Sequence, residues 1–140
     1  MPTTLLSSRS FTAYYRNLAP IADYAMQYAR DLGFDHKALY AIELALDEAC
    51  ANIIDHAYHG EGKGSIDIDL STEDSLFVIK VEDRGQAFDP KSIPAPDLTS
   101  PLDIRNERGL GVYTMRKLMD RVDFSRCKGK NCLLLAKHLP

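Results

Sequence analysis

The feature that most constrains this chain is a long amphipathic pattern that ends in the residues ELALDEACANIIDHAY. Apolar residues recur in it at steps of three and four, as along one face of an α-helix, at Leu39, Ile42, Leu46, Ala49 and Ile53. Asp35 can cap such a helix, because its side chain accepts a hydrogen bond from a free N–H of the first turn. We predict one helix from Asp35 to about residue 58 that buries this stripe.

The other periodic segments can supply the layer that covers this stripe. Alternating apolar and polar residues over 65–70 and 76–82 predict two strands joined as an antiparallel hairpin. Helices are expected over 17–30 and 110–119, a first strand over 3–9, and a closing hairpin over 121–127 and 131–138. No repeat or linker divides the chain, so the order predicts an α+β, two-layer sandwich in one domain, 1–140.

Charge and hydropathy narrow the function classes. A net charge of −3 gives no reason to expect a nucleic-acid partner, which requires a basic surface. No apolar run approaches the length of a membrane span, and the first residues lack the apolar centre of a signal peptide. We therefore expect a cytoplasmic protein with no membrane partner, whose three cysteines are free thiols.

A carboxylate and a carboxamide lie one turn apart on the long helix, at Glu48 and Asn52. At roughly 100° per residue they fall nearly opposite the apolar stripe, beside the small residues Ala41 and Ala45. Something could therefore approach this face closely. An ordinary solvated polar face is the competing interpretation, and the pair alone does not decide between them.

Asp83 follows the second strand of the hairpin, and Gly85 lies two residues further on. A carboxylate at the end of a strand can accept a hydrogen bond from an exocyclic amine such as that of adenine. A glycine beside it lets a flat ring approach the backbone without meeting a Cβ. A simple Asp-x-Gly turn would have the same residues, so this motif is also ambiguous by itself.

Arg108, Gly109 and Gly111 lie where the third helix is expected to begin. Free N–H groups and the positive end of the helix dipole suit phosphate oxygens at such a site. The glycines would let phosphates reach the backbone, and the arginine would add charge. A structural turn into a helix is the alternative.

In this order, the motifs E-x-x-x-N, D-x-G and G-x-G resemble the N, G1 and G2 boxes of the GHKL ATPase superfamily, which includes histidine kinases and type II topoisomerases. The short single-domain form, HAY at the end of the first box and AFDP after the G1 aspartate resemble the anti-sigma factor serine-protein kinases. The resemblance covers about residues 9–138. It implies a Bergerat-type sandwich, with a mixed, mostly antiparallel sheet covered on one face by helices.

The resemblance also implies that ATP and Mg²⁺ bind between the helices and a mobile lid, residues 86–108. Asn52 would coordinate Mg²⁺, Asp83 would read the adenine amine, and Gly85 would admit the ring. The residues that would hold the phosphates are Arg108, Gly109 and Gly111.

In the same family, Glu48 would be the general base that takes the proton from a serine hydroxyl. The implied function is an anti-sigma factor and serine-protein kinase that phosphorylates an anti-anti-sigma (STAS-type) protein and regulates a sigma factor by partner switching. A homodimer is also implied. An ATP-dependent partner-binding module with little or no kinase activity is the alternative. A detached histidine-kinase catalytic domain is a third, although these residues contain no helix pair bearing a phospho-acceptor histidine.

Two positions depart from the superfamily pattern. Ala87 stands where the G1 box usually has its second glycine, which slightly restricts the backbone near the nucleotide. Gly129, Lys130 and Asn131 stand where a Gly-Thr pair is often found. A threonine contact to the base is therefore expected to be absent or supplied by another residue.

Overall fold

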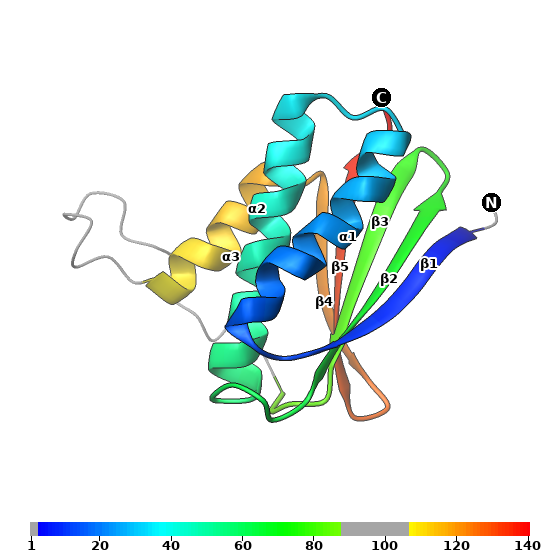
Figure 1. The fold of residues 1–140 in the computed structure, drawn as a ribbon. Helices are drawn as coiled ribbons and strands as arrows, with labels where there is room; N and C mark the ends of the chain where they lie inside the picture. The colour runs from blue at the N-terminus through cyan, green and yellow to red at the C-terminus, as the bar shows by residue number, and fades with distance from the viewer. Residues whose placement is uncertain (1–2, 88–106) are drawn as a thin grey trace.

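The computed structural model describes residues 3–87 and 107–140. Its strands form one sheet in the order β1-β2-β3-β5-β4, and each of the four pairings is antiparallel, so among the described residues the sheet is antiparallel and not mixed as expected. Within the described part, helices cover one face of this sheet, which gives the two-layer α+β architecture predicted from the sequence (Figure 1). The strands are β1 (Thr3–Thr12), β2 (Ser65–Glu73), β3 (Leu76–Asp83), β4 (Arg121–Cys127) and β5 (Lys130–His138).

Three α-helices lie within the described residues: α1 (Leu18–Asp31), α2 (His36–Asn52) and α3 (Glu107–Leu118). In Figure 1, α2 lies between α1 and α3 over the sheet. None of the described helices is both long enough and apolar enough to cross a membrane.

The strands run further than their local patterns predicted. β1 continues to Thr12 and β2 to Glu73, because the two strands pair along their whole length, from Thr3 with Glu73 to Thr12 with Ser65. Strand length here follows from the partner strand rather than from local alternation.

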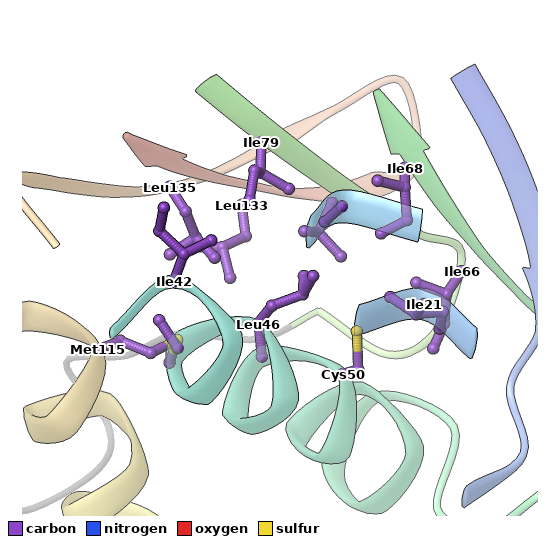
Figure 2. Packing of buried hydrophobic residues seen from close by; sticks show 14 of the residues in the cluster. Ile21, Ile42, Leu46, Cys50, Ile66, Ile68, Ile79, Met115, Leu133 and Leu135 are labelled. Carbon is purple, nitrogen blue, oxygen red and sulfur yellow. The ribbon is translucent and has the colours of Figure 1, made fainter. Parts of the chain in front are cut away.

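The core lies between the sheet and the helices. Figure 2 shows Leu46 of α2 pointing toward the sheet, among Ile21 of α1 and Ile68 and Ile79 of β2 and β3. Each of these four side chains is at most 1% exposed. Burying one such side chain contributes about 1.5–3 kcal/mol, so this layer contact fixes α2 on the sheet.

Helix α2 begins as predicted but ends differently. The Asp35 carboxylate accepts a hydrogen bond of 2.9 Å from the Ala38 N–H and so caps the helix. The α-helix ends at Asn52, and a single π-helical turn follows over Ile53–Ala57. The predicted α-helix to residue 58 is therefore wrong in its last turn. Such π turns are rare and often lie at functional sites.

Candidate functional site

Asp83 is held at the end of β3 by two donors. Its side chain is buried, at 4% exposed, and Oδ1 accepts hydrogen bonds of 2.9 Å from the Gly85 N–H and from Asn131 Nδ2. Asn131 stands opposite Asp83 in the β3–β5 pairing. No described residue donates to Asp83 Oδ2. The predicted acceptor is therefore present, with one oxygen occupied by the protein and the other unused by the described residues.

Burial raises the pKa of the Asp83 carboxyl, and the donors from Asn131 and Gly85 oppose that rise. Desolvation disfavours the charged form, whereas hydrogen bonds donated to a carboxylate favour it. The positive charge of Arg126 acts in the same direction as the donors. The three groups oppose the effect of burial without cancelling it, so the pKa of the Asp83 carboxyl stays above its ordinary value.

Sequence reasoning did not assign a role to Asn131 or Arg126. Asn131 Nδ2 also donates to the Gln86 carbonyl at 2.8 Å, and Asn131 Oδ1 accepts from Arg126 Nη1 at 3.0 Å. Arg126 further contacts the carbonyls of Gly85, at 3.5 Å, and Gly129, at 3.3 Å. The departure from the Gly-Thr pattern thus places an amide beside Asp83. The strand register, which was not known from sequence, was the signal needed to find it.

The packing of the protein requires a glycine at position 85, whether or not a ligand binds. A Cβ at this position would lie 2.6 Å from the carbonyl carbon and oxygen of Ala57. The Gln86 N–H donates to that same carbonyl at 2.8 Å. Tyr58 makes a second connection to this segment. Its hydroxyl accepts a hydrogen bond of 3.0 Å from the Arg84 N–H and donates one of 2.7 Å to the Ser65 carbonyl. The π turn therefore anchors the segment that follows Asp83.

The face of α2 that bears Glu48 and Asn52 is not a solvated face. A Cβ at Gly111 of α3 would lie 3.0 Å from Glu48 Oε2 and 3.7 Å from the Asn52 amide atoms. Ala41 and Ala45 on the same face are buried. The close approach anticipated from the small residues is made by α3, which packs against α2 here.

Asn52 has an unsatisfied polar atom at this contact. Its Nδ2 is buried and has no hydrogen-bond partner among the described residues. Buried amides are nearly always paired, and a 180° rotation of the side-chain amide exchanges the positions of its nitrogen and oxygen. An amide left unpaired at this position fits a site for Mg²⁺ and phosphate oxygens. Burial also raises the pKa of the neighbouring Glu48.

The glycines of the third motif are placed differently from the prediction. Helix α3 begins at Glu107, about three residues earlier than expected, so Gly109 lies in its first turn and Gly111 within the helix. The first four N–H groups of a helix have no partner inside it, so the N–H of Gly109 has no partner within α3. The Arg108 side chain and most of the expected lid, residues 88–106, lie outside the described residues.

One cavity joins two of the predicted binding residues. Both Asn52 and Asp83 line it, together with Asn131. Its remaining walls are mostly apolar and come from α2, the π turn, α3 and the closing hairpin: Ala49, Ile53, Ala57, Met115, Phe124, Ser125, Cys132 and Leu133. Apolar walls with a few convergent polar groups are typical of small-molecule sites. In chemical character, these lining groups match an apolar ring that carries an exocyclic donor.

The chain is similar to one protein-family model and to relatives that share one name. Residues 11–137 match the family model described as a histidine kinase-like ATPase domain. A protein of Halalkalibacterium halodurans named serine-protein kinase RsbW is 34% identical over 105 residues, which cover 72% of this chain and 64% of that protein. RsbW of Bacillus thuringiensis is 31% identical over 110 residues, covering 76% of this chain and 68% of that protein. The chain thus spans about two thirds of these relatives.

Solved structures show the same fold at lower sequence identity. The RsbU and RsbW domains of Rv1364c from Mycobacterium tuberculosis match 96% of this chain and 33% of that chain, with a TM-score of 0.66 and 17% identity. The histidine kinase AdeS of Acinetobacter baumannii matches 96% of this chain and 68% of that chain, with a TM-score of 0.52 and 15% identity.

Proposed function

Because this chain belongs to the histidine kinase-like ATPase family, among the serine-protein kinases of the RsbW type, we propose that it is an ATP-dependent serine-protein kinase. One observation carries this proposal. Glu48 and the unpaired amide of Asn52 lie on successive turns of α2, against Gly111 of α3. Asn52 also lines the cavity that holds Asp83.

The nucleotide-binding residues that we propose line the cavity, lie beside Asp83 or lie at α3. Asp83 accepts a hydrogen bond from the adenine amine, and Gly85 keeps the segment beside it in place. Asn52 would hold Mg²⁺, and the ion would supply positive charge that neutralises the phosphates. The phosphates would lie at the start of α3, against Arg108 and the Gly109 N–H, and Gly111, which lies within the helix beside Asn52, would leave room for them.

Glu48 acts as the general base. Partial burial beside α3 raises the pKa of this carboxyl, which makes its ionised form a stronger proton acceptor. It would take the proton of a serine hydroxyl as that oxygen bonds to the γ-phosphorus, while the bond from this phosphorus to the bridging oxygen breaks and ADP leaves. A positioned base of this kind typically contributes about 10²–10⁴-fold to the rate.

The substrate we propose is a serine of an anti-anti-sigma (STAS-type) protein in the cytoplasm. The same chain would bind a sigma factor, act as a homodimer, and exchange one partner for the other according to phosphorylation. This part of the proposal rests on the relatives named serine-protein kinase RsbW.

The test is transfer of labelled phosphate from ATP to a candidate STAS protein from the same genome. We expect phosphoserine with the wild type and Mg²⁺, and at least a hundredfold slower transfer with Glu48→Gln. Glu43→Gln is the matched control, because Glu43 is an exposed glutamate on the same helix. Equal transfer by Glu48→Gln and Glu43→Gln would refute the role of Glu48.

A specific observation favours the alternative, a nucleotide-dependent binding module with little transfer. Gly111 lies so close to Glu48 Oε2 that α3 restricts the approach of a serine hydroxyl in this arrangement. ATP-dependent binding of the sigma factor and the STAS protein, without any phosphorylated product, would establish this alternative.

A further inference from the structure

The polar groups around Asp83 leave one of its oxygens for a ligand. Oδ1 is occupied by the Gly85 N–H and by Asn131 Nδ2, each at 2.9 Å. Oδ2 accepts no hydrogen bond from a described residue, and Asp83 lines the cavity. The carboxylate is thereby held in one orientation, in which Oδ2 has no donor among the described residues.

Asn131 is itself fixed from both ends of its amide. Nδ2 donates to Asp83 and to the Gln86 carbonyl, at 2.8 Å, and Oδ1 accepts from Arg126 Nη1 at 3.0 Å. Arg126 cannot accept a hydrogen bond, so the amide cannot flip without placing its NH₂ group against a donor. The amide orientation, with NH₂ toward Asp83, therefore follows from the arginine.

We propose that Asn131, oriented by Arg126, is a positioning residue that determines selection of the 6-amino group of the purine. The proposal rests on the proposed ATP site and adds the residues that set its base preference. A carboxylate held as a pure acceptor matches the amine of adenine. The 6-oxo group of hypoxanthine is itself an acceptor, so ITP leaves two acceptors facing each other, which is unfavourable.

Removal of the Asn131 amide should change the preference for ATP over ITP and not only weaken the binding of both nucleotides. With the amide gone, Asp83 has one donor fewer, rotates more freely and binds a proton more readily. A protonated carboxyl can donate to a 6-oxo group. Among the described residues, the charged or titratable side chains that face Asp83 are Arg126 of β4 and Tyr58 after the π turn. Neither side chain donates a hydrogen bond to Oδ1.

The experiment measures dissociation constants of ATP and ITP for the full chain at one pH. We expect the wild type to prefer ATP, and Asn131→Ala to reduce the ATP-to-ITP preference by about tenfold, the lower end for a hydrogen bond to a charged group. Arg126→Gln should also reduce the ATP-to-ITP preference, but by less than Asn131→Ala does. Asn131→Thr, whose hydroxyl can still donate, should retain part of it and replaces Asn131→Ala if that variant does not fold.

Asn17→Ala is the matched control. Asn17 Nδ2 donates to the Thr12 carbonyl at 2.7 Å at the start of α1, so its loss should leave the preference unchanged. An unchanged ATP-to-ITP ratio in the Asn131 variants, or equal weakening of both nucleotides, would overturn this inference while leaving the ATP site intact. Absence of ATP binding by the wild type would instead overturn the proposed function and this inference with it.

Discussion

Replacing Gly111 by alanine should separate stability from activity. Alanine in a helix interior is favoured over glycine by about 0.5–1 kcal/mol. The new Cβ would lie 3.0 Å from Glu48 Oε2, which is a few tenths of an ångström closer than an ordinary contact. That oxygen is the end of a flexible side chain and can retreat at small cost. We therefore expect the free energy of unfolding to rise by about 0–1 kcal/mol.

Activity should fall in the same variant. A misplacement of 1 Å in a reacting group can cost about a hundredfold in rate, so a shift of a few tenths of an ångström in Glu48 should cost about tenfold or less. Urea unfolding measures the first quantity, and phosphate transfer at saturating ATP measures the second. Lys117→Ala, at an exposed position on another face of the same helix, is the control because it leaves this contact unchanged. A destabilisation above about 1 kcal/mol would show that α3 cannot accommodate the methyl group, and unchanged transfer would show that the position of Glu48 is not critical.

Three other changes test the site. Gly85→Ala should destabilise the fold by about 1–3 kcal/mol or more, measured by urea unfolding, because its Cβ would meet the Ala57 backbone at 2.6 Å. Asn52→Ala should stabilise the ligand-free protein by removing an unpaired buried amide while abolishing the Mg²⁺ dependence of ATP binding; unchanged Mg²⁺ dependence in a titration would contradict its role. Asp83→Asn should abolish ATP binding. A carboxyl whose pKa is raised by folding binds protons more readily in the native state, so its ionisation lowers the free energy of unfolding as the pH rises above about 4. Asp83→Asn removes this carboxyl and should make that loss of stability smaller. Thermal melts at several pH values measure that slope.

Local patterns predicted the fold well because the strands and helices each bury one face. The alternation of Ile66, Ile68 and Leu70 and the three- and four-residue steps of α2 follow directly from the geometry of a strand and a helix. The Asp35 cap was predictable for the same reason, since a cap depends only on its immediate neighbours.

The π turn was not predictable from the same reasoning. Five residues, Ile53–Ala57, are too short a segment for a period to distinguish a π turn from an α turn. The choice depends instead on long-range partners: the Ala57 carbonyl accepts from Gln86, and Tyr58 reaches both Ser65 and Arg84. The Tyr58–Arg84 bond, for example, joins residues 26 apart in the chain, which no local window contains.

The site shows the same division between local and non-local information. The separate motifs identified Glu48, Asn52 and Asp83, because each is a residue type suited to its chemistry. The environment of each depends on an element far away in sequence: α3 covers Glu48 and Asn52, and β5 brings Asn131 to Asp83. A departure from a family motif can therefore be interpreted only after the strand register is known. Here the register shows that Asn131, which stands where a Gly-Thr pair is often found, lies beside Asp83. Its effect on base preference can therefore be tested.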